Sequence, residues 1–124
     1  MPIYIDVALA TNSANEGATA TGWFPLDQYS QPFNVGFAVS HVTTSSQWKV
    51  QHTFANVYRN PATPEALAPT IPASEIYDHS SVSAAQSPVD GNYIAPVRAV
   101  RFALASARTS GRSCARFQLI QAGY

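Results

Sequence analysis

Apolar and polar residues alternate most clearly between residues 33 and 54. Apolar side chains occupy every second position from Phe33 to Val39, and after the polar residues 43–47 the alternation resumes with Trp48, Val50 and Phe54. Alternation with a period of two is typical of a half-buried strand, because successive side chains leave opposite faces. The pattern predicts two strands, joined as a hairpin, whose apolar face the rest of the molecule must cover.

Three further segments alternate in the same way. Residues 3–9 predict a first strand, and residues 97–104 and 115–119 predict two strands that pair as a second hairpin over the core. Trp23 and Phe24 stand beside a proline and predict a bend or an edge strand. The strands therefore account for both ends of the chain.

The region between these strands, residues 58–97, contains six of the nine prolines. Proline interrupts both helices and central strands, so the region predicts a long, ordered surface loop with short elements. Residues 63–68 permit one helical turn, and residues 76–83 permit a short edge segment. Asp90-Gly91-Asn92 is typical of a tight turn.

Together the segments predict an all-β fold. Six or seven alternating strands, polar turns and no helix longer than one turn indicate an antiparallel β-sandwich, jelly-roll-like, with one long Pro-rich loop. Residues 1–124 are the length of a single domain. A small closed barrel is the alternative, and sequence spacing does not choose between the two.

Charge is sparse in this chain. Only 11% of the residues are charged, whereas an average soluble domain has about 25%. A surface with so few charges suits contact with other protein in an oligomer or a larger assembly. The other interpretation is a surface kept in solution by Ser, Thr and Gln.

The few charges are unevenly distributed. The segment before Arg98 holds all seven acidic residues and two basic ones, a net −5, and the remaining segment holds five arginines and no acid, a net +5. Either the two parts pack together and cancel, or the basic end of one protomer meets the acidic surface of another. The net charge of zero and the absence of a basic cluster predict no binding to nucleic acid.

Targeting and redox signals are few. Cys114 is the single cysteine and cannot form an internal disulfide bond. No basic segment followed by an apolar stretch begins the chain, and no apolar run approaches 18 residues, so we expect neither a secretory signal peptide nor a membrane span.

The residue patterns also predict no enzyme chemistry, cofactor or metal. His41, His52, His79 and Asp78 match no metal-binding spacing. Histidines 41 and 52 share strand parity with apolar neighbours, which allows inward-facing rings, and the favoured interpretation is a hydrogen-bonded histidine in the core or in a loop. No Gly-x-Ser-x-Gly motif occurs. The acids that could serve glycoside hydrolysis lie in the loop-rich region with nothing to fix their separation.

Carbohydrate binding is the alternative from another functional class. Exposed aromatic rings stack on sugars, and the candidates in this chain are Trp23, Tyr29, Tyr58, Tyr77 and Tyr93. The same rings also suit loops fixed onto a sheet, or an interface between proteins.

Several stretches together resemble a known family. They are Gly22 to Asp27, Pro32 to Phe37, Trp48 to Phe54, Tyr77 to His79, Pro96 to Arg101 and Phe117 to Gly123. In this order they are similar to small virion proteins of tailed bacteriophages that act as capsid cement or decoration proteins. The resemblance implies a jelly-roll-like sandwich on the capsid exterior that bridges shell subunits and carries no catalysis.

From this resemblance and the surface composition we expect the following partners. The protein would be made in the host cytoplasm, would bind the major capsid protein, and would associate with itself as a homodimer or homotrimer. A tail or receptor-binding component of the virion is an alternative. The expected contact residues are Ile3, Tyr4 and Ile5 in the first strand, Tyr58, Arg59, Leu67 and Ile71 in the loop, and Arg108, Arg112 and Tyr124 near the end of the chain.

Overall fold

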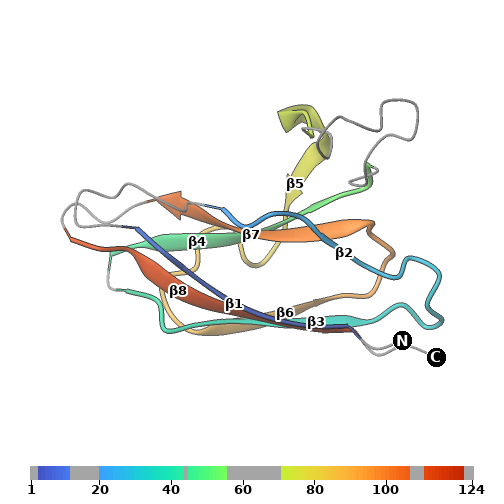
Figure 1. The fold of residues 1–124 in the computed structure, drawn as a ribbon, viewed down its shortest axis with the longest axis horizontal. Coiled ribbons are helices and arrows are strands. Elements are labelled where there is room, and N and C mark those ends of the chain that lie inside the picture. Colours follow the sequence, from blue (N-terminus) through green and yellow to red (C-terminus); the bar gives the residue numbers. More distant parts are fainter. Residues whose placement is uncertain (1–2, 12–19, 44, 56–70, 107–110, 122–124) are drawn as a thin grey trace, which may run out of the picture.

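The fold consists of two four-stranded antiparallel sheets packed face to face (Figure 1). The computed structural model describes residues 3–11, 20–43, 45–55, 71–106 and 111–121. The first sheet has the order β1-β8-β3-β6, with β1 (Ile3–Ala10), β8 (Cys114–Gln121), β3 (Val35–Ser40) and β6 (Val89–Tyr93). The second has the order β2-β7-β4-β5, with β2 (Phe24–Pro25), β7 (Ala99–Ser106), β4 (Gln47–Thr53) and β5 (Ile76–Asp78), and a 3-10 turn η1 (Ala73–Glu75) precedes β5.

The strand pairing defines a jelly roll. The first strand pairs with the last, the second with the seventh, the third with the sixth and the fourth with the fifth. Two further pairings, β3 with β8 and β4 with β7, join these nested pairs into the two sheets. The predicted jelly-roll-like β-sandwich is thereby confirmed, and the two separate sheets do not form the alternative closed barrel.

The core lies between the two sheets and is centred on three stacked rings. Trp48 of β4 stacks on Phe102 of β7 at 5.0 Å between ring centroids, and Phe102 stacks on Phe117 of β8 at 5.1 Å. Because Phe117 belongs to the first sheet and the other two rings to the second, this stack joins the sheets. All three side chains are fully buried.

Both predicted hairpins are wrong. β3 and β4 lie in different sheets, and so do β7 and β8, so the connections between them cross from one sheet to the other. The physical reason is that two strands facing one core from opposite sides show the same alternation as two paired neighbours. The apolar face predicted for each strand is confirmed, whereas the strand predicted to pair with it is wrong.

The predicted turn at Asp90-Gly91-Asn92 is also wrong, because these residues form the middle of strand β6. Gly91 lies opposite Phe37 in the register, and a Cβ atom added to Gly91 would lie 2.7 Å from Cζ of that ring. The glycine is thus needed for the close approach of an aromatic ring and not for a turn. The short segments predicted at β5 and β2 are confirmed as edge strands.

The inward orientation that strand parity allowed for His41, and predicted for Phe54, is not observed. His41 is exposed, has a positive φ of 53° and lies just after the end of β3. Phe54 follows the last residue of β4 and is 56% exposed. Side chains alternate between the two faces only within a strand. His41 and Phe54 each follow the last residue of a strand, so odd or even position no longer indicates which way their side chains point. The helical turn predicted for residues 63–68 lies outside the described residues.

Candidate functional site

The predicted N-terminal contact region lies on β1, at one edge of the first sheet. β1 pairs with β8 along its whole length. Tyr4 points outward and is 61% exposed, whereas Ile3 and Ile5 face inward and are only partly buried at the margin of the core. The prediction therefore falls on an exposed ring and on an apolar edge that is half covered.

The remaining predicted contact residues do not gather with β1. Ile71 is buried with Ala99 in a small second cluster on the other sheet, so it offers little surface to a partner. Arg112 is exposed and its Nε donates to the carbonyl oxygen of Thr11 at 3.0 Å. The others lie outside the described residues, namely Tyr58, Arg59, Leu67, Arg108 and Tyr124.

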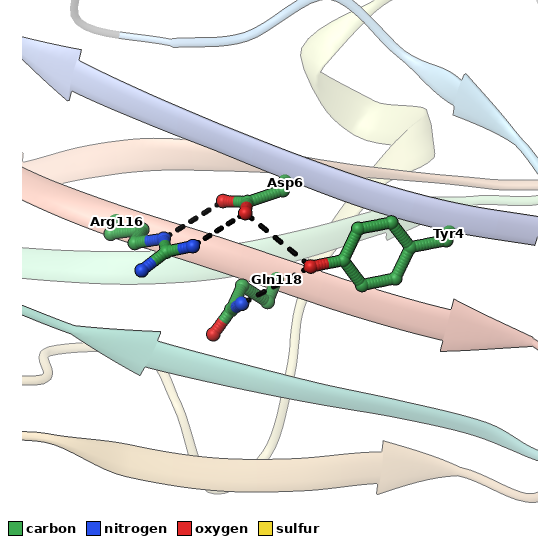
Figure 2. Close-up of polar contacts among 4 residues, drawn as sticks. All are labelled: Tyr4, Asp6, Arg116 and Gln118. Carbon is green, nitrogen blue, oxygen red and sulfur yellow. Dashed lines mark hydrogen bonds and ion pairs between the residues drawn. The ribbon is translucent and has the colours of Figure 1, made fainter.

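A polar network covers the outer face of β1 and β8 (Figure 2). Arg116 binds the carboxylate of Asp6 in a two-point arrangement, with Nε donating to Oδ1 at 2.8 Å and Nη2 donating to Oδ2. The Tyr4 hydroxyl donates to the same Oδ2 at 3.4 Å and accepts a hydrogen bond from Gln118 Nε2 at 3.3 Å. The hydrogen bond from Arg116 holds the pKa of Asp6 below its usual range.

This network leaves the outer face nearly neutral. It contains the one ion pair among the described residues, and each of its charges already has a partner on the neighbouring strand. An approaching surface would therefore meet amide groups and the ring of Tyr4 and not an isolated charge.

An open groove runs along β3 beside this network. β3 presents only small side chains outward, with Gly36 opposite Ile120 and Ala38 opposite Gln118 in the register. Taller side chains on β8 and β6 rise on either side, so that a hollow of about 290 Å³ forms between Tyr4, Ile120, Gln118 and Asp90. The groove is thus a direct consequence of two small residues in the middle of the sheet.

A second hollow of about 480 Å³ lies on the outer face of the second sheet. Arg101 is fixed there, because its Nε donates to Gln51 Oε1 at 2.7 Å and its guanidinium lies 4.9 Å from the centre of the Trp23 ring. Gln51 in turn donates from Nε2 to Asp78 at 2.8 Å. Burial lowers the pKa of Arg101, and the charge of Asp78 opposes that effect.

An aromatic ladder fills the edge of the sandwich opposite β1, where β5 and β6 meet. It consists of Phe54, Tyr77, His52, Tyr93, His79 and Phe37, with centroids of successive rings 5.0–5.9 Å apart. Its outer end is exposed, with Tyr77 at 48% and Phe54 at 56%, and its inner end reaches the core. The ladder therefore presents large rings that are held in place from below.

The histidines of the ladder are engaged in structural contacts. His79 Nδ1 accepts from the backbone N–H of Ser81 at 3.1 Å and its Nε2 donates to the carbonyl oxygen of Asn92 at 3.0 Å. His52 Nδ1 lies 3.0 Å from the Tyr93 hydroxyl. Burial lowers the pKa of His52, the charge of His79 adds to this and Asp78 opposes it, while burial also raises the pKa of Tyr93.

Within the described part of the chain, no group of three or more His, Cys, Asp or Glu residues is placed to hold a metal ion. Among the same residues, no helix is both long and apolar enough to cross a membrane. Three surface features stand out in the described part of the chain: the β1 edge with its polar network, the groove on β3, and the aromatic ladder with the adjacent Arg101 hollow.

Sequence reasoning missed most of these groupings. Arg101, Gln51 and Asp78 are far apart in the sequence and come together only through the pairing of β7, β4 and β5. The groove on β3 also depends on which strands flank Gly36 and Ala38. The one usable signal was the loss of bulky outward residues in the sequence Val-Gly-Phe-Ala-Val of β3.

Comparison with models of protein families and with curated protein sequences found no match. Comparison with solved structures found a similarity to a chain from a study of Bacillus endospore appendages, described as a novel family of disulfide-linked pili. The two chains share 10% sequence identity at a TM-score of 0.45, and the alignment covers 100% of this chain and 88% of the other. A similarity at this level carries no argument about function.

Proposed function

We propose that this protein is a non-catalytic structural component of a bacteriophage particle, a decoration protein that binds the outside of the head across boundaries between capsid subunits. One observation supports this most directly. Exposed apolar and aromatic groups lie at two opposite edges of one small sandwich, the β1 edge and the aromatic ladder. A molecule with binding surfaces on opposite sides is suited to bridging two neighbours.

The aromatic ladder is the proposed surface for the capsid shell. The rings of Phe54 and Tyr77 contact each other at 5.9 Å between centroids, and both pack against His52. Because these contacts already restrict the two side chains, little side-chain entropy is lost when a partner binds over them. Aromatic anchors of this kind supply much of the affinity at protein interfaces. Repetition over a capsid then turns a modest affinity at each site into stable attachment.

The test is the addition of purified protein to undecorated heads of the phage that encodes it. We expect attachment at a fixed number of copies per head and a higher temperature of head disruption. Phe54→Ser and Tyr77→Ser should each weaken attachment, because each removes an exposed anchor. Tyr29→Ser is the matched control, since Tyr29, in the segment between β2 and β3, is 81% exposed but is not one of the rings of the ladder.

Two results would count against this proposal. The first is wild-type protein that fails to attach to heads and is absent from purified particles by mass spectrometry. The second is attachment that Tyr29→Ser weakens as much as the ladder variants do, because the ladder would then not be the attachment surface.

Carbohydrate binding is the second candidate, and the groove on β3 favours it. Tyr4 provides an exposed ring on one side, and Asp90 and Gln118 provide a carboxylate and an amide that could bind sugar hydroxyls. A glycan array tests this candidate directly. Retention on glycans that is lost in Tyr4→Ala and Asp90→Asn, with no attachment to heads, would favour a sugar-binding module.

A further inference from the structure

The four sheet edges of the sandwich differ in how well they are protected. β2 has two residues and includes Pro25, β5 has three residues, and β6 has five residues with Asp90-Gly91-Asn92 at its centre. Natural edge strands are commonly kept short or interrupted by proline, charge or bulges, since a free edge invites pairing with another strand. These three edges follow that rule.

β1 departs from this rule in its length and regularity, and its one charged residue, Asp6, is already paired with Arg116 of β8. It has eight residues, Ile-Tyr-Ile-Asp-Val-Ala-Leu-Ala, with no proline, glycine or lysine, and its register with β8 runs without a bulge. Among the described residues, β8 is the only strand that pairs with it. One full row of backbone N–H and C=O groups of β1 is therefore directed away from the sheet.

The apolar side of β1 is also incompletely covered. Ile3, Ile5 and Val7 are partly buried and lie at the margin of the core, whereas the inward residues of the neighbouring strand β8 are buried. A strand placed beside β1 would bind its backbone and cover these side chains at the same time. Backbone and side chains thus point to the same missing neighbour.

We propose that β1 pairs antiparallel with β1 of a second copy of this chain across a twofold axis, so that two four-stranded sheets become one eight-stranded sheet. A twofold axis brings the same edge of both copies together, so the two paired strands have the same length of eight residues. The other edges in the described structure are too short to pair over eight residues. The inference stands on the edge alone and holds whether or not the protein decorates a capsid.

Charge and side-chain parity restrict the register of the pairing. Outward residues of one copy must lie beside outward residues of the other, and Asp6 is the only charged residue on β1. Asp6 opposite Asp6 would place like charges together. The favoured registers set Asp6 opposite Tyr4 or Ala8 of the second copy, which puts residue 5 or residue 7 on the twofold axis.

The first test is hydrogen exchange combined with sedimentation at several concentrations. We expect a dimer in which the β1 backbone N–H groups that point away from β8 are protected from exchange. This protection should disappear when the dimer dissociates on dilution. A monomer at every concentration would overturn the proposal. A dimer in which these same N–H groups exchange freely would also overturn it, and so would protection of these groups that persists in the monomer.

The second test uses substitutions at the edge. Ile5→Lys should yield a folded monomer, because an inward lysine on an edge strand prevents pairing. Asn92→Lys, on the opposite edge strand β6, should remain a dimer. Dissociation by both variants, or by neither, would contradict the proposal.

If the Ile5→Lys variant does not fold, cross-linking tests the β1 pairing without that variant. In a Cys114→Ser background, Ile5→Cys or Val7→Cys should cross-link efficiently with a short thiol reagent, and Asn92→Cys should not. Equal cross-linking at β1 and at Asn92 would exclude the β1 pairing.

Discussion

At the scale of single residues, the structure assigns definite physical roles to side chains whose sequence context was ambiguous. Gly91 looked like part of a turn and instead makes room for the ring of Phe37. His52 looked like one more core residue and instead links an exposed pair of rings to Tyr93. Both roles depend on contacts with distant segments, and each leads to a measurable consequence.

The close approach at Gly91 predicts that Gly91→Ala is destabilising. The added methyl group would overlap Phe37, a ring packed against His79, Tyr93 and Phe117, so we expect a loss of about 1–3 kcal/mol in the free energy of unfolding. Gly36→Ala is the matched control, because its Cβ would meet no atom within 4 Å. Urea unfolding measures both, and equal stability of the two variants would refute this role for Gly91.

The lowered pKa of His52 predicts a dependence of stability on pH. The unfolded chain binds a proton near the ordinary histidine pKa of about 6.5, whereas the folded chain resists that proton down to a lower pH. The unfolded state therefore binds more protons in this range, and the stabilisation present above about pH 6.5 is lost as the pH falls through the folded pKa.

His52→Gln should reduce this loss of stability between about pH 7 and about pH 5. The measurement is urea unfolding of both proteins at each pH. An identical pH dependence in wild type and variant would show that His52 does not contribute.

At the scale of elements, the strands could be predicted from the sequence but their partners could not. The alternation of β1, β3, β7 and β8 identifies each strand and its buried face. It is silent on whether the next strand pairs beside it or packs opposite it, and both predicted hairpins failed for that reason. The candidate surfaces depend on the pairing, so only the β1 part of them could be anticipated.

One buried side chain fixes a connection between elements. Gln121, at the end of β8, is fully buried, and its amide group both accepts from the backbone N–H of Asp27 at 2.9 Å and donates to the carbonyl oxygen of the same residue at 3.0 Å. This pair of hydrogen bonds holds the segment after β2 against the first sheet.

Gln121→Leu should therefore lower the free energy of unfolding by about 1–3 kcal/mol, because two partly buried backbone groups of Asp27 lose their hydrogen-bond partner. Gln118→Leu, on the exposed face of the same strand, is the matched control and should change stability far less. Thermal unfolding followed by circular dichroism compares them. A larger loss in the Gln118 variant would contradict this account of the connection.

At the scale of the whole molecule, the jelly roll creates two open sides with different properties. On one side β1 leaves an unprotected edge. On the opposite side, where β5 and β6 are the edge strands of the two sheets, the aromatic ladder lies between the sheets. The low charge of the chain had suggested a surface made for contact with other protein, but composition alone could not locate it. The location that we propose rests on which strands the fold leaves outermost.

A reconstruction of the phage particle by electron cryomicroscopy tests the central claim, that these two sides are interfaces, most directly. The account predicts copies on the outside of the head, joined in pairs through their β1 strands and seated on the shell through Phe54 and Tyr77. Particles that lack the protein, or copies bound with both of these sides facing solvent, would contradict it.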